Sequence, residues 1–79
     1  MRAKELCVVL TFYTTADAMA MENFCQIHSL PGRLIPIPRS LSAGCGMAFK
    51  VSKKEADSLF FESIYNSDIE IEQVVEMEL

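Results

Sequence analysis

Cys45 is the residue of this sequence whose surroundings best suit covalent chemistry. It lies between Gly44 and Gly46, and Arg39 and Ser42 precede it in the same segment. Glycine has no Cβ atom, so another molecule can approach closely and neighbouring backbone N–H groups can point at the sulfur. The thiolate is the nucleophilic form of cysteine, and a nearby cation stabilises it, so the segment suits sulfur or selenium chemistry. The alternative is that the glycines only permit a tight turn and Cys45 fills space.

The other nucleophiles and bases are less favourably placed. Cys7 falls in an apolar strand pattern and Cys25 near an apolar helical stripe, so both are predicted to be packing residues. His28 is expected at the end of the first helix, where the helix C-terminus stabilises an imidazolium, and too far from Cys45 for a catalytic pair. The chain has neither a C-x-x-C motif nor a His/Cys cluster, so no metal and no cofactor is expected.

Composition excludes several classes of protein. Seven Lys and Arg against eleven Asp and Glu argue against a nucleic-acid partner. No apolar run approaches the ~20 residues of a membrane span. The run 6–10 is too short for a signal peptide. Three cysteines without metal spacing indicate free thiols in a reducing compartment, so we expect a cytoplasmic protein.

Four segments have the alternation of β-strands. Residues 5–12 are apolar on both faces, which predicts a central strand. Residues 33–37 include Pro36, which cannot donate to a ladder, so this strand should be short or lie at an edge. Residues 46–51 form the third strand. Residues 69–79 place apolar side chains on one parity and glutamates on the other, which predicts one buried face and one acidic face.

Two segments have helical spacing. The first begins at an N-cap formed by Thr14 or Thr15 and stops before Pro31. The second has the spacing of a capping box over residues 52–55 and ends near Asn66. The predicted inward stripes are Ala16, Met19, Ala20, Phe24 and Ile27 in the first helix and Ala56, Leu59, Phe60 and Ile64 in the second.

This order of elements predicts one α+β domain over residues 1–79, a ferredoxin-like βαββαβ sandwich. We expect a four-stranded antiparallel sheet in the order 4-1-3-2, with two helices on one face. Residues 38–45 then lie at the same end of the sheet as the first helix N-terminus, so Thr14 and Thr15 would help to stabilise a thiolate. The face without helices would expose an apolar patch, favouring a homodimer that covers Cys7; the patch contains Cys7, Val9, Ile35 and Ile37.

Residues 33–46 read R-L-I-P-I-P-R-S-L-S-A-G-C-G. This run resembles the signature R-x-I-P-x-P-R-x-[LI]-S-x-x-C-G of a family of small bacterial domains described as putative selenium/sulfur carrier protein-like. The stretch from Phe12 to Glu22 is similar to the family's helix start, F-x-S/T-T-x-x-A-x-x-x-E, although Tyr13 and Thr14 replace the usual proline or serine. The long, acidic C-terminal strand is a second departure from the family.

The resemblance implies a carrier rather than a turnover enzyme. Cys45 would hold sulfur or selenium as a persulfide or selenosulfide and relay it between donor and acceptor proteins. Two alternatives involve no sulfur chemistry. A small-molecule sensor would have a pocket near residues 13–15 and 39–45, and an interaction subunit would use the sheet face without helices.

Overall fold

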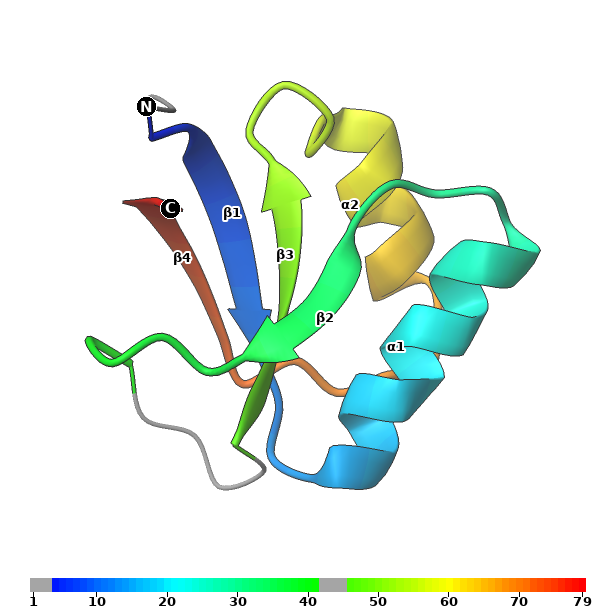
Figure 1. Ribbon diagram of the computed structural model, residues 1–79. Helices are drawn as coiled ribbons and strands as arrows, with labels where there is room; N and C mark the ends of the chain where they lie inside the picture. Colours follow the sequence, from blue (N-terminus) through cyan, green and yellow to red (C-terminus); the bar gives the residue numbers. More distant parts are fainter. Residues whose placement is uncertain (1–3, 42–45) are drawn as a thin grey trace.

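The computed structural model describes residues 4–41 and 46–79, which form a four-stranded antiparallel sheet and two helices (Figure 1). The sheet order is β2-β3-β1-β4, which reads 4-1-3-2 from the other edge. The predicted α+β class and succession of elements are confirmed. The elements are β1 (Leu6–Thr11), α1 (Thr15–Ile27), β2 (Arg33–Pro36), β3 (Met47–Ser52), α2 (Ser58–Tyr65) and β4 (Gln73–Glu78).

β1 is the central strand that its sequence predicts. It pairs with β3 on one side and with β4 on the other, and residues 7–12 are all buried. β2 is an edge strand that pairs with β3 and ends at Pro36. A proline at the end of an edge strand leaves no ladder hydrogen bond unmade, which explains both its position and the shortness of β2.

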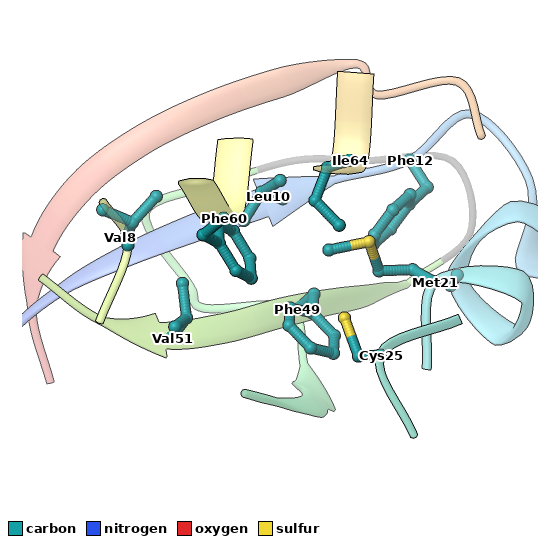
Figure 2. Packing of buried hydrophobic residues seen from close by; sticks show 11 residues of the cluster. Val8, Leu10, Phe12, Met21, Cys25, Phe49, Val51, Phe60 and Ile64 are labelled. Atoms are coloured by element: carbon teal, nitrogen blue, oxygen red, sulfur yellow. The ribbon is translucent and has the colours of Figure 1, made fainter. Parts of the chain in front are cut away.

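The core lies between one face of the sheet and the two helices (Figure 2). Val8 lies opposite Val51 and Leu10 opposite Phe49, so these four side chains share a face. Both helices contribute to the same cluster, so they cover this same face. Each large side chain buried here stabilises the fold by roughly 1.5–3 kcal/mol relative to exposure. The helical members of the cluster are Ala18, Met21, Cys25, Phe60 and Ile64.

The predicted inward stripe of α1 is wrong except at Phe24, which packs against the core. The helix buries Ala18, Met21 and Cys25, whereas Met19 and Ile27 are 60% and 68% exposed. The helix carries apolar residues at helical spacing on two sides, so periodicity alone does not determine which side packs against the sheet. The helix begins after the N-cap Thr14 and ends at the C-cap His28, close to the predicted boundaries.

The predicted start of α2 is also wrong. Asp57 is the N-cap, and its carboxylate accepts a hydrogen bond from Phe60 N at 2.9 Å. Ser52 instead caps a turn, since its hydroxyl accepts from Lys54 N at 3.3 Å. Leu59, assigned to the inward stripe, is 72% exposed. The helix ends at Asn66, as predicted.

The last strand is shorter than its alternation predicts. β4 begins at Gln73, and Ile69 and Ile71 pack against the helix-side core before the strand starts. Val75 lies opposite Val9 and Met77 opposite Cys7, so these side chains face away from the helices. The predicted alternation holds within β4, where Val75 and Met77 are half-buried and the glutamates are exposed. The apolar side chains do not all share one side, however: they face the helix-side core before the strand begins and the other side within it.

The sheet face without helices is not the exposed apolar patch that the sequence predicts. Cys7 and Val9 are both 0% exposed within this single chain, and Ile35 and Ile37 are half-buried. Residues 37–41 leave β2 on this side of the sheet, away from α1 and α2 (Figure 1). Cys7 is already buried within a single chain, so its burial gives no reason to expect a homodimer through this face.

Candidate functional site

The segment that carries Cys45 in the sequence connects β2 to β3 at one end of the sheet. Pairing of Thr11 with Ala48 and of Pro36 with Met47 places the ends of β1 and β2 beside the start of β3. The chain reaches the N-terminus of α1 directly after β1, at this same end (Figure 1). The described stems of the segment, at Ile37 and Gly46, thus lie at the end of the sheet where α1 begins, as the sequence predicts for them. Ser42, Gly44 and Cys45 themselves lie outside the described residues.

Gly46 follows Cys45 and fixes where β3 begins. Its carbonyl oxygen accepts a hydrogen bond from Ile37 N at 3.1 Å, which joins the two stems of the segment. Its φ is +73°, in the left-handed region, where a residue with a Cβ atom costs about 1–2 kcal/mol. A Cβ atom built on Gly46 would meet nothing within 4 Å. This glycine is therefore required by backbone conformation, and the space beside it is open.

Thr14 is the N-cap of α1, and Thr15 is the first helical residue. The Thr14 hydroxyl accepts a hydrogen bond from Asp17 N at 3.1 Å and donates one to Asp17 Oδ2 at 2.9 Å. These bonds occupy the hydroxyl, so Thr14 acts as a helix cap. The Asp17 carboxylate also lies at the positive end of the helix, where it partly offsets the field that a thiolate would use.

Arg39 is exposed, in a turn closed by a hydrogen bond from Leu41 N to Pro38 O at 3.0 Å. In Figure 1 this turn lies apart from the first turn of α1. The structure therefore does not bring Arg39 and Thr14 together. No described carboxylate forms an ion pair with Arg39, so its charge is available to an anion.

Both cysteines within the described residues are free and buried. Cys7 is 0% exposed, and its thiol donates to Glu5 O at 3.4 Å. Cys25 is 2% exposed, and burial raises the pKa of its thiol to about 11. A protonated thiol without access to solvent is a poor nucleophile. The prediction that Cys7 and Cys25 are packing residues is confirmed.

His28 is the C-cap of α1, at the end of the helix opposite Thr14. Its ring contacts that of Phe24, with 4.3 Å between centroids. A helix of 13 residues is about 20 Å long, so His28 lies far from the start of α1. Its predicted position as the end of the first helix is confirmed.

Glu72 lies where the chain approaches β4 beside the end of β1, and its role is not apparent from the sequence. Its carboxylate accepts a hydrogen bond from the buried Thr11 hydroxyl at 3.2 Å, and its N–H donates to Thr11 O at 2.8 Å. The strand alternation counted Glu72 as one of several solvated glutamates. Only the pairing of β1 with β4 shows that Glu72 links these two strands at this end of the sheet.

Two surface hollows are defined by described residues, and neither includes residues 13–15. One lies at the opposite end of the β2–β3 pair, and the other lies between α1 and the segment after α2. A small-molecule pocket beside the α1 N-terminus thus has no support from these two hollows. Among the described residues, no helix has the length and apolarity to cross a membrane, and no group of three or more His, Cys, Asp or Glu could hold a metal ion.

Fold and site define a small α+β domain in which the interior cysteines are structural and the signature cysteine lies in the β2–β3 connection. The chain belongs to the family described as putative Se/S carrier protein-like, which matches residues 7–76. This match includes the whole signature over 33–46 and confirms the resemblance. No curated protein and no solved structure matches the chain.

Proposed function

We propose that this protein carries sulfur or selenium on Cys45, as a persulfide or a selenosulfide, and relays it from a donor protein to an acceptor protein. Family membership supports a carrier role. The observation that carries the assignment to Cys45 is the burial of the other two cysteines, Cys7 and Cys25. Neither can receive an atom from another protein without unfolding of the core, so Cys45 is the thiol left for this role.

The transfer is a thiol–persulfide exchange in which no external oxidant is needed. The Cys45 thiolate attacks the outer sulfur of a donor persulfide, a new S–S bond forms on Cys45, and the donor sulfur leaves as a thiolate. An acceptor thiolate then attacks that outer sulfur, and Cys45 leaves as a thiolate. Neither step requires a histidine base, which accords with the position of His28 at the far end of α1.

The described stems of the segment contribute access and charge to this role. A Cβ atom on Gly46 would meet nothing within 4 Å, and Arg39, which forms no ion pair with a described carboxylate, supplies a cation on the other stem. A cation favours the thiolate and attracts anionic reactants. We assign Gly44 and Ser42 the supporting role of backbone N–H and hydroxyl donors toward the sulfur.

We also assign the βαββαβ succession to the ferredoxin-like class, because the sheet order and the two helices over one face fit it. Free cysteines and a cargo held on a cysteine thiol are compatible with a reducing compartment, so we propose that the protein works in the cytoplasm.

The test is intact-mass analysis after incubation with a cysteine desulfurase and free cysteine, which together generate a persulfide. We expect the protein to gain the mass of one sulfur atom. The gain should disappear in Cys45→Ala and persist in Cys7→Ala and Cys25→Ala, each first checked for folding by thermal melting. Equal labelling of all three cysteines, or a gain that survives Cys45→Ala, would refute the assignment.

A further inference from the structure

The helix layer exposes an apolar surface that the core does not use. Met19 and Ile27 of α1 are 60% and 68% exposed. Ile27 lines a hollow of about 360 Å³ between α1 and the segment that follows α2. We call this hollow the helix groove; its walls include Ala20, Phe24 and Ile27 on one side and Ser67–Ile69 on the other.

The two elements that form the helix groove carry acidic residues and no Lys or Arg. α1 contains Asp17 and Glu22 but no Lys or Arg, and residues 56–79 contain only acidic charges. Asp68 lines the groove itself. The basic residues of the chain all belong to the N-terminal segment, to β2, to β3 or to the connections that follow these strands: Arg2, Lys4, Arg33, Arg39, Lys50, Lys53 and Lys54.

We propose that the helix groove docks a basic segment of a partner protein, which inserts an apolar side chain between α1 and Ser67–Ile69. An apolar anchor in a pocket supplies most of the binding energy in such contacts. Lys or Arg residues beside the anchor would face Asp68, and the acidic charge of both groove elements would steer the encounter and select the partner.

A second copy of this chain is a poor occupant of the groove. Two-fold pairing through this surface would set the acidic helix layers of both copies against each other, since neither layer contains a compensating Lys or Arg. The proposal thus commits to a basic partner of different sequence. This docking proposal goes beyond the carrier role. Its test involves no sulfur transfer and no change at Cys45, so the docking proposal and the carrier role can fail independently.

The probe is a synthetic helical peptide with a leucine stripe on one side and Lys and Arg elsewhere. It is titrated into the isotope-labelled full chain while backbone NMR shifts are recorded. We expect saturable shifts centred on Ala20, Ile27 and Ser67–Ile69. Replacing the leucines by serine, or the basic residues by glutamate, should each weaken binding by about tenfold or more. Raising the salt concentration should weaken binding of the basic peptide.

Matched variants separate this groove from the acidic surface in general. Ile27→Ser should weaken peptide binding by about tenfold, whereas Val74→Ser should leave it unchanged, because Val74 is 43% exposed on the acidic strand β4 outside the groove. Both side chains are exposed, and thermal melting checks that both variants fold. Shifts centred on β4, equal loss in both variants, equal binding of the acidic peptide, or no binding would overturn the proposal. So would self-association in ultracentrifugation that Ile27→Ser abolishes.

Discussion

Gly32 comes directly before β2 and Gly46 directly before β3, so the two glycines lie at opposite ends of this antiparallel pair. Both have positive φ angles, +111° for Gly32 and +73° for Gly46. A Cβ atom on Gly32 would overlap Phe49 Cε1 and lie 2.9 Å from Lys50 O, whereas one on Gly46 would meet nothing within 4 Å. Packing and backbone conformation both require the first glycine, and backbone conformation alone requires the second. One end of the strand pair is closed by packing against the core, whereas at the other end the side-chain position of Gly46 is open.

Gly32→Ala should give the largest loss of stability. The new methyl group would be forced against the Phe49 ring, which adds an overpacking cost of about 1–3 kcal/mol to a backbone cost of about 1–2 kcal/mol. Urea unfolding should show a loss of about 3 kcal/mol in the free energy of unfolding. In a Phe49→Leu background the same substitution should cost less. A loss below about 1 kcal/mol would mean that this end is not closed by packing.

Gly46→Ala should cost only the backbone term, about 1–2 kcal/mol in the free energy of unfolding. Gly46→Asn should cost less, because asparagine tolerates the left-handed region better than alanine. The same urea titration measures both variants. If Gly46→Ala were as damaging as Gly32→Ala, the open space beside Gly46 would not exist, and the contrast between the two ends would be lost.

Thr14→Ala should destabilise the protein by about 1 kcal/mol through loss of the α1 N-cap. Thr14→Ser keeps a hydroxyl and should restore most of this loss. Thr15→Ala is the matched control at the next position, where an exposed side chain changes stability by no more than about 0.5 kcal/mol. Thermal melting of the three variants checks this. Equal losses at Thr14 and Thr15 would contradict the capping geometry.

The stability that the buried Cys25 thiol contributes should be full at neutral pH and should fall only in alkali. Burial raises the pKa of this thiol to about 11 in the folded chain, above the value of about 8.5 for an unfolded thiol. The folded state therefore binds the proton more tightly, so this contribution to stability is complete below about pH 8.5 and is lost as the pH rises toward 11.

Denaturant titrations of the wild type and of Cys25→Ala between these pH values isolate this contribution. The stability advantage of the wild type should shrink with rising pH, because the variant has no thiol at this position to titrate. A constant or growing advantage would indicate that Cys25 ionises as easily in the core as in the unfolded chain.

Much of the sheet follows from local patterns, because strand alternation and a proline restrict where a segment can pair. The two apolar faces of β1 and the position of Pro36 predict a central strand and an edge strand, and both predictions hold. Thr14 is likewise the cap that the sequence offers. These features depend on neighbouring residues alone.

The errors occur where two local solutions compete and tertiary packing decides between them. α1 has apolar stripes on two sides, and contact with Phe49 and the rest of the core selects the one that contains Met21 and Cys25. Ser52 and Asp57 are both acceptable caps, but Ser52 pairs with Cys7 as the last residue of β3, so α2 begins after Asp57. For the site, the sequence predicts that the β2–β3 connection and the start of α1 share one end of the sheet. It does not predict that the Thr14 hydroxyl is already hydrogen-bonded to the Asp17 carboxylate.

Site-resolved alkylation of the three cysteines in the folded protein tests whether the chemistry belongs to the β2–β3 connection. Native protein is treated with iodoacetamide near neutral pH, and labelling of each cysteine is followed by peptide mass spectrometry. We expect Cys45 to react about a hundredfold faster than Cys7 and Cys25, which require opening of the core before they react. If Cys45 reacts no faster than the two buried cysteines, Cys45 is not the carrier residue.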